Sequence, residues 1–159
     1  MPFRELTRKN KEITREEAIE LLTRETRGTL AVNGDSGYPY AMPMNHFYNV
    51  GDGCIYFHCG RIGHRLDSLR RSDKVSFCVC EEGYREEGDW AYNVRSVIVF
   101  GRIEVIDDIE KVVTITNALC RKFTLDEEYI QKEIRDHGKA TLLLKLTPEH
   151  ISGKRVKES

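Results

Sequence analysis

Hydrophobic residues along the chain change their spacing several times, and each change marks an expected element. Between Ala18 and Leu22 they follow helical spacing. The preceding segment, Thr14-Arg15-Glu16-Glu17, has the pattern of a capping box, in which the threonine hydroxyl and the glutamate carboxylate satisfy free backbone N–H groups. We therefore expect a helix that begins after Thr14 and ends at Gly28. Three further helices are expected: a short one after Arg65, one over 109–123 and one from Asp126 to about Asp136.

Six apolar runs predict β-strands. Lys74 to Cys80 alternates large apolar residues with serine and cysteine, and this period of two is typical of a half-buried strand. Val97 to Phe100 is continuously apolar, which favours a strand buried on both faces, and the following Gly101 indicates a bulge or a close backbone approach. The expected strands are 29–32, 38–49, 54–58, 74–80, 93–106 and 140–146.

Short glycine-containing turns at 33–37 and 50–53 connect the first three strands, so we expect these strands to form an antiparallel meander. Six antiparallel strands with helices at the ends indicate a small β-barrel of the α+β class, mainly β. With 159 residues and 40% hydrophobic content, the chain has enough material for one core. We expect a single domain over 1–159 with short polar tails at 1–12 and 152–159.

Charge and cysteine content narrow the class of protein. The chain has 25 Lys and Arg residues against 26 Asp and Glu residues, mixed along its length, so it lacks the basic field that nucleic-acid binding uses. No apolar run reaches the roughly 18 residues of a membrane span, and the N-terminus has no apolar signal-peptide core. The cysteines at 54, 59, 78, 80 and 120 form no disulfide framework. We expect a cytoplasmic protein without nucleic-acid or membrane partners.

The segment from Ile55 to Asp67 carries the clearest candidate chemistry. An apolar strand runs into a loop bracketed by Gly60 and Gly63, and the loop opens a short helix that starts near His64 and Arg65. Glycines let the backbone turn tightly near a ligand, and the free N–H groups of a helix start favour an anion. The segment therefore predicts a phosphate site, with an ordinary strand–loop–helix junction as the alternative.

Other polar residues suggest weaker hypotheses. Four of the cysteines and three histidines are zinc-ligand types, but no Cys-x-x-Cys pair occurs, and Cys78 and Cys80 point to one face of a strand. Small buried cysteines explain that pair better, and we expect no metal site. The charged loop 81–90 carries Trp90, which is a candidate lid over a substrate or a contact with a partner subunit.

Four segments in the same order resemble the FMN-binding split barrel of the pyridoxamine 5′-phosphate oxidase superfamily, and more closely its nitroimidazole-resistance branch. The resemblance spans roughly residues 14 to 154. The segments are Tyr38-Pro39-Tyr40-Ala41-Met42-Pro43-Met44-Asn45, the run from Tyr56 to Arg65, Val94-Arg95-Ser96-Val97-Ile98-Val99-Phe100-Gly101, and Ile151-Ser152-Gly153-Lys154. This resemblance implies a six-stranded antiparallel split β-barrel with flanking helices.

The resemblance also implies a cofactor site for FMN. Family members lay the second strand along the flavin ring, hold its phosphate with the strand–loop–helix, and approach the ring from the long strand. They usually carry Lys at the position of Arg65, and often Arg or Lys at that of His64. They are homodimers with FMN at the subunit interface, so the second chain is expected to supply some contacts. The implied cofactor-binding residues are Pro43, Met44, Asn45, His58, Cys59, Gly63, His64, Arg65, Ser96 and Val97.

The implied function is that of an FMN-dependent oxidoreductase, which passes electrons from NADH or NADPH through FMN to a small organic acceptor. The alternatives are a flavin or haem carrier without turnover and, last, pyridoxamine 5′-phosphate oxidase itself, whose basic C-terminal segment the tail 154–159 does not reproduce. The catalytic residues are not identified. His58 and His46 are either proton donors or residues that shape the pocket, and Lys154 either reaches the FMN or is an exposed tail lysine.

Overall fold

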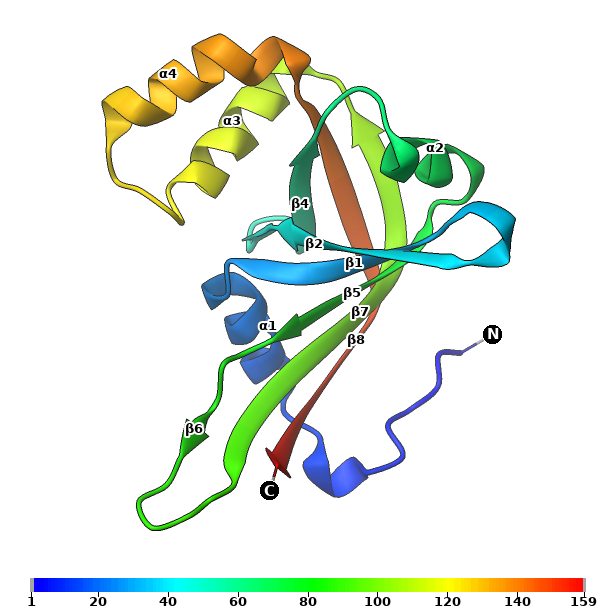
Figure 1. Ribbon diagram of the computed structural model, residues 1–159, viewed down its shortest axis with the longest axis vertical. Coiled ribbons are helices and arrows are strands. Elements are labelled where there is room, and N and C mark those ends of the chain that lie inside the picture. The colour runs from blue at the N-terminus through cyan, green and yellow to red at the C-terminus, as the bar shows by residue number, and fades with distance from the viewer. Residues whose placement is uncertain (1, 159) are drawn as a thin grey trace.

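One antiparallel sheet organises the chain in the computed structural model, which describes residues 2–158 (Figure 1). Seven strands follow one another in the order β2-β1-β5-β7-β8-β4-β3, and the short strand β6 pairs with β7 outside this path. The sheet curls into a half-barrel (Figure 1), which is the expected split barrel with one more main strand than the six predicted. The strand bounds are β1 Arg27–Asn33, β2 Pro39–Asn45, β3 Phe47–Asn49, β4 Cys54–Cys59, β5 Lys74–Cys80, β6 Tyr84–Arg85, β7 Tyr92–Ile106 and β8 Leu142–Glu158.

Four α-helices flank the sheet close to where the sequence predicts them. Their bounds are α1 Arg15–Arg24, α2 His64–Arg71, α3 Ile109–Cys120 and α4 Glu127–His137, and short 3₁₀ turns lie at Lys9–Lys11, Asp35–Gly37 and Gly138–Ala140. The predicted end of the first helix at Gly28 is wrong, because α1 ends at Arg24 and Gly28 lies in β1. Thr14 caps α1 by accepting a hydrogen bond from the Glu17 N–H at 3.1 Å, while Asp108 and Asp126 cap α3 and α4. The helix α3 covers the outer side of β4 and β8, where Val112 and Ile115 join a small apolar cluster. None of the helices within residues 2–158 has both the length and the apolar composition of a membrane span.

The predicted strand over 38–49 is wrong as a single element, because it divides at His46. Its first part, β2, pairs with β1, and its second part, β3, pairs with β4. Both antiparallel pairings expected for the first three strands are therefore present, but they form two separate hairpins at opposite ends of the sheet order and not one continuous meander. Period-two alternation continues through His46, so it gave no signal for the break.

The His46 junction is buried and tightly bonded. The His46 ring is fully buried, its Nε2 lies 2.8 Å from the Leu22 carbonyl oxygen, and its edge faces the ring of Phe77. The Lys122 ammonium donates to the carbonyls of His46 and Glu25, at 2.9 and 2.6 Å, which fastens the end of α3 to the same point. Burial, followed by the positive charge of Lys122, lowers the pKa of His46 to about 4, so the ring is neutral at pH 7.

The predicted end of the last strand is wrong as well. Strand β8 continues far beyond Leu146, and residues 152–158, expected as a polar tail, pair with β7 over their whole length. Gly153 is buried there against Ile13, whose N–H donates to the Gly153 carbonyl at 3.0 Å. The segment has few large apolar residues, so backbone pairing rather than side-chain burial defines it as a strand.

Strand β7 has one buried and one open face, which corrects the expectation of burial on both. Val97 and Val99 are fully buried, whereas Ile98 and Phe100 are each 37% exposed. The bulge predicted at Gly101 is confirmed by a register shift between Phe100 and Gly101. A side chain at Gly101 would collide with the Thr147 carbonyl, so the position requires glycine.

The buried His46 makes stability depend on pH in a defined window. The unfolded chain keeps the ordinary pKa near 6.5, whereas the folded ring titrates at about 4, so the unfolded state binds more protons between these values. We expect the free energy of unfolding to lose about 3 kcal/mol through this residue as the pH falls from 6.5 to 4. Urea unfolding at several pH values, with His46→Gln as a non-titrating reference, measures it. The stability gap between the two proteins should shrink by that amount, and parallel profiles would contradict the assignment.

Candidate cofactor-binding site

The loop between β4 and α2 lies beside β2 and borders a pocket of about 160 Å³. The residues that line it come from the three elements expected at a phosphate site, and they are Tyr40, Cys59, Gly60, Ile62, Gly63, His64, Arg65 and Leu66. Of the residues predicted for the cofactor, Cys59, Gly63, His64 and Arg65 line this pocket, and Tyr40 of β2 contributes to it without having been predicted.

The N-terminus of α2 has no side-chain cap within the described residues. Gly63 is its N-cap, and no side chain accepts a hydrogen bond from the first backbone N–H groups of the helix. Gly63 has φ 138° and ψ 170°, a conformation that is essentially restricted to glycine. An uncapped helix start of this kind offers free donors and a partial positive charge to an anion.

Arg65 brings a positive charge to the same place. Its Nε lies 2.9 Å from the Met42 sulfur, a weak acceptor, and within residues 2–158 the guanidinium has no carboxylate partner. The contact with Met42 also ties the helix to β2. Arg61, in contrast, turns away and bonds the Asp107 carboxylate at 2.8 and 3.2 Å, so it anchors the loop and leaves the pocket to Arg65.

The neighbouring His58 and Cys59 are uncharged at neutral pH. The His58 side chain is open at its edge, yet burial of much of its ring lowers its pKa, and the positive charge of Arg65 lowers it further. Burial raises the pKa of the Cys59 thiol, against the opposing influence of Arg65. The Cys59 thiol therefore adds no negative charge that would repel an incoming anion, and the His58 ring is neutral.

None of the three β2 residues predicted for the site lines the pocket; they follow Tyr40 and Met42, the β2 residues that contact His64 and Arg65. Pro43 is exposed, Met44 is buried in the core, and Asn45 accepts a hydrogen bond from Arg27 Nε at 3.1 Å. Since β2 is an edge strand, its outward backbone groups are open to a ligand, and Met44 could contact one only through its backbone.

Ser96 and Val97 are not brought to the pocket within one chain. Arg61 fixes the loop next to Asp107, just beyond the end of β7, and Ser96 lies roughly 30 Å of strand away from that end. The Val97 side chain faces the core, whereas Ser96 faces outward between Cys80 and Lys154. Any contact of these residues with a ligand in the pocket therefore requires a second chain.

The cysteines differ from expectation in their burial. Cys78 and Cys80 share one face of β5, as predicted, but both are exposed because that face of the sheet is uncovered. Within residues 2–158 no group of three His, Cys, Asp or Glu side chains is arranged to bind a metal ion. Trp90 is 85% exposed in the loop before β7.

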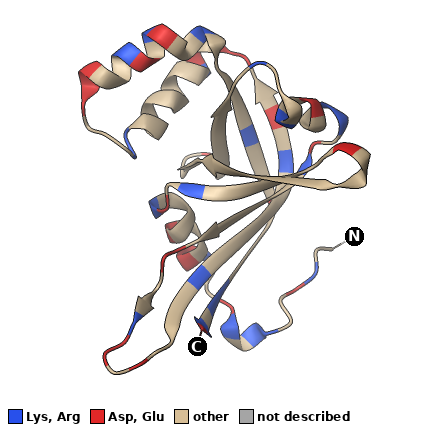
Figure 2. Cartoon of the chain, in the orientation of Figure 1, with Lys and Arg blue, Asp and Glu red and all other residues tan. Residues whose placement is uncertain are grey.

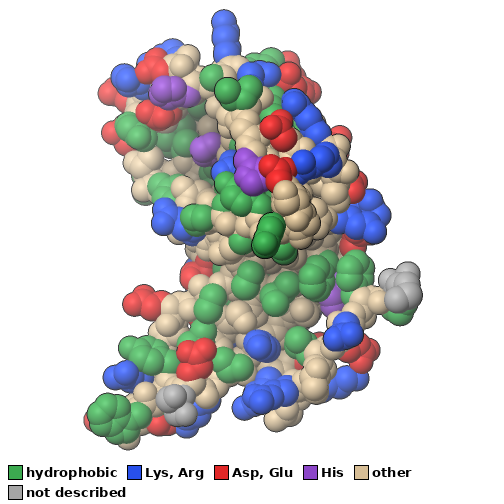
Figure 3. Space-filling model, turned by 45° about the vertical axis from the view of Figure 1, so that its right-hand side comes forward, with side chains coloured by type: hydrophobic (Ala, Val, Ile, Leu, Met, Phe, Trp, Pro, Cys, Tyr) green, Lys and Arg blue, Asp and Glu red, His purple; other side chains and the backbone are tan. Residues whose placement is uncertain are grey.

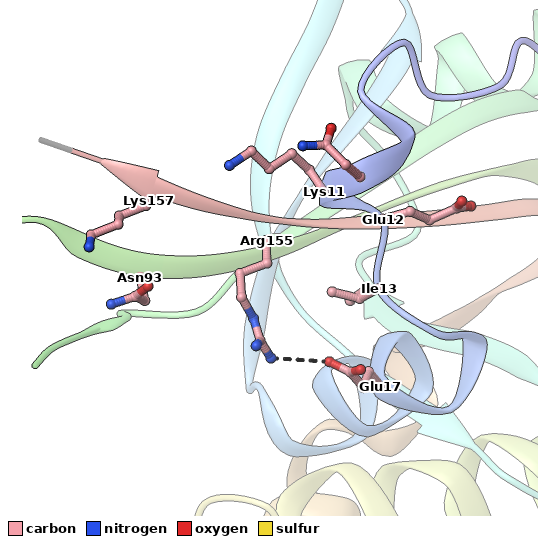
Figure 4. A pocket seen from close by; sticks show the side chains of 8 residues that line it. Lys11, Glu12, Ile13, Glu17, Asn93, Arg155 and Lys157 are labelled. Carbon is pink, nitrogen blue, oxygen red and sulfur yellow. Dashed lines mark hydrogen bonds and ion pairs between the residues drawn. The ribbon is translucent and has the colours of Figure 1, made fainter.

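A second cavity, of about 310 Å³, lies between the N-terminal segment, α1 and the ends of β7 and β8 (Figure 4). Two of its three cations are engaged by acids: Arg155 bonds Glu17 at 3.2 Å, and Lys157 bonds Asp89 at 2.6 Å, while the third is Lys11. Unlike the pocket at Arg65, this cavity has carboxylates of its own, Glu12 and Glu17, in its lining. Its lining residues are Asn10, Lys11, Glu12, Ile13, Glu17, Asn93, Arg155 and Lys157.

A curled antiparallel half-barrel sheet with flanking helices defines the fold as a split barrel, with a pocket at the start of α2. The chain belongs to the pyridoxamine 5′-phosphate oxidase-like family, because the family model described as pyridoxamine 5′-phosphate oxidase matches residues 14–155. No curated protein matches the sequence.

Solved structures share the fold. A proposed 5-nitroimidazole antibiotic resistance protein from Bacteroides thetaiotaomicron is 19% identical with a TM-score of 0.75, over 92% of this chain and 87% of that one. An FAD and haem binding protein from Mycobacterium smegmatis is 25% identical with a TM-score of 0.71, over 94% and 74%. An FAD-binding protein from Mesorhizobium loti is 22% identical with a TM-score of 0.64, over 92% and 97%.

The backbone of Gly63 gives a test of the loop geometry. A Cβ at Gly63 would meet no atom within 4 Å, so Gly63→Ala costs only backbone strain, and we expect a loss of about 1–3 kcal/mol in the free energy of unfolding. Gly60→Ala is the matched control, because Gly60 is equally open and has no positive φ. Urea unfolding of both variants checks this, and equal stability of the two would contradict the strained conformation at Gly63.

Proposed function

We propose that this protein is an FMN-dependent oxidoreductase that passes electrons from NADH or NADPH through FMN to a small organic acceptor. One observation carries the proposal: among the described residues 2–158 Arg65 has no carboxylate partner, and it lies at the uncapped start of α2, beside the open edge of β2. A guanidinium and free helix N–H groups together suit a phosphate monoester. The flavins named for the FAD-binding relatives carry phosphate as well.

The chain's own residues would bind and orient the cofactor. Arg65, the His64 side chain and the backbone after Gly63 would hold the phosphate, and the outer edge of β2 from Pro43 to Asn45 would receive the flavin ring. Bound FMN supplies the redox chemistry, accepting a hydride from a nicotinamide and passing electrons on. His58, neutral beside Arg65, lies next to the pocket residue Cys59 and could offer a hydrogen bond to the cofactor only at the edge of the pocket. All five cysteines are free thiols, which supports a reducing, cytoplasmic location.

A binding and reduction experiment tests this function. Purified protein titrated with FMN should quench flavin fluorescence with a measurable Kd. Addition of NADH or NADPH without oxygen should then bleach the flavin absorbance, and an organic acceptor should restore it. A protein that fails to bind FMN would contradict the proposed site.

Substitutions on α2 locate the phosphate contact. Arg65→Ala should weaken FMN binding by about 1–3 kcal/mol, because a charged hydrogen bond to phosphate is lost. Riboflavin, which has no phosphate, should bind both proteins equally. Arg70→Ala is the matched control, since Arg70 is exposed on the same helix and does not line the pocket. Equal FMN affinity of the Arg65 and Arg70 variants would contradict the assignment.

A flavin or haem carrier is the second candidate, and the Mycobacterium smegmatis relative named for both cofactors favours it. A carrier would bind FMN or haem but would show no bleaching by nicotinamides and no turnover. The reduction step above therefore separates the two functions.

We further propose a homodimer in which the open sheet face is the interface. Ile98 and Phe100 are exposed there, Cys78 pairs with Ile98 across the strands, and Ser96 faces the same way. Hydrophobic side chains gather across the middle of the molecule in the space-filling view (Figure 3). A second chain on this face would also explain how the Ser96 side chain of the partner subunit approaches the cofactor, whereas Val97, which faces the core, could do so only through its backbone.

Thiol accessibility tests the dimer. At concentrations where sedimentation shows a dimer, Cys78 and Cys80 should react slowly with a thiol reagent, and dilution to the monomer should expose them. Cys54 and Cys59 are buried within each chain and serve as internal controls that stay unreactive in both states. A monomer at all concentrations, or thiols equally reactive throughout, would contradict this interface.

A further inference from the structure

The turn between β1 and β2 reaches across to α2 and contacts both ends of that helix. At the tip, the Asp35 carboxylate lies 2.6 Å from Arg71 Nη1 and 3.5 Å from His64 Nε2. Beside it, the Asn33 side-chain amide donates to the Ser72 hydroxyl at 3.1 Å. Figure 2 shows this acidic tip next to the basic positions of α2. One carboxylate therefore links a turn to the helix that opens the phosphate pocket.

The turn holds Asp35 in a defined position. The Gly34 N–H donates to the Tyr38 carbonyl, and the Tyr38 N–H donates to the Asp35 carbonyl, both at 3.0 Å. Ser36 and Gly37 have φ of 56° and 79°, so the chain turns back sharply between these bonds. A carboxylate on a closed turn loses little freedom when it binds a neighbour.

His64 is held from two sides at the mouth of the pocket. Its ring stacks on Tyr40 with centroids 4.0 Å apart and planes 17° apart, and its Nε2 faces Asp35. Both His64 and Tyr40 line the pocket, so fixing one ring on the other fixes part of the pocket wall. Because Nε2 lies on the side of Asp35, at 3.5 Å, Nδ1 is the ring nitrogen directed away from this carboxylate.

We propose that Asp35 is a positioning residue of the phosphate pocket: it orients the His64 ring against Tyr40, so that the pocket accepts the terminal phosphate monoester of the cofactor. The inference rests on the proposed function and extends it to the β1–β2 turn. The competing explanation is a clamp, in which Asp35 stabilises α2 through Arg71 alone. That contact is the shorter one, so the experiment must separate the two roles.

Five variants, compared with the wild type, and two ligands separate them. We expect Asp35→Asn to raise the Kd of FMN about fivefold and to leave the Kd of riboflavin unchanged, since only FMN has the phosphate. In a His64→Gln background, Asp35→Asn should have no further effect on FMN, because the residue it orients is gone. Arg71→Gln removes the helix clamp but keeps Asp35 beside His64, so it should bind FMN like the wild type. Asp136→Asn, which breaks a comparable surface ion pair with Lys132 on α4, is the matched control.

The outcomes distinguish this role from the proposed function. Wild-type protein that binds no FMN would overturn the function, and the role of Asp35 with it. Wild-type binding with an unaffected Asp35→Asn variant would overturn only the positioning role. An Arg71→Gln variant as weak as Asp35→Asn, an equal loss for riboflavin, or an undiminished effect in the His64→Gln background would each show that the turn acts as a clamp.

Discussion

The structure depends on one constraint of connectivity: the two edge strands of the sheet, β2 and β3, follow each other in the chain with only His46 between them. A flat sheet would hold its edges far apart, so the sheet must curl until they meet. The junction is then sealed by buried contacts, with the Leu22 carbonyl on the His46 ring and the Lys122 ammonium on its backbone. Helices α1 and α3 are therefore held at the same point that closes the sheet.

The candidate site lies along the edge of β2 that remains unpaired when the sheet curls. Strand β2 keeps an unpaired edge, and Met42 and Tyr40 on it meet Arg65 and His64 on α2. The sheet and the helix thus contribute complementary parts, a row of backbone groups and a positive helix start. The outer face of β5 and β7 is largely uncovered in a single chain, apart from the Phe3 ring that stacks on Phe100, and this is the face that we propose as the dimer interface.

Much of this arrangement could be predicted from local sequence signals, since helix caps at Thr14, Asp108 and Asp126 and the bulge at Gly101 are fixed by neighbouring residues. The glycine-bracketed loop likewise located the pocket. The division at His46 could not be predicted, because alternation continues across it and only long-range pairing separates β2 from β3. The contacts of Asp35 with His64 and Arg71 could not be predicted for a similar reason, because the sequence of a turn does not show which helix the turn will contact.

The position of β8 has a consequence for how the protein is made. Strand β8 lies between β7 and β4, so it joins a part containing β2, β1, β5 and β7 to a part containing β4 and β3. During synthesis these two parts have no shared hydrogen-bond ladder until residues 142–158 leave the ribosome. The nascent chain consequently exposes the edges of β7 and β4 until then, and the final strand converts two incomplete sheets into one.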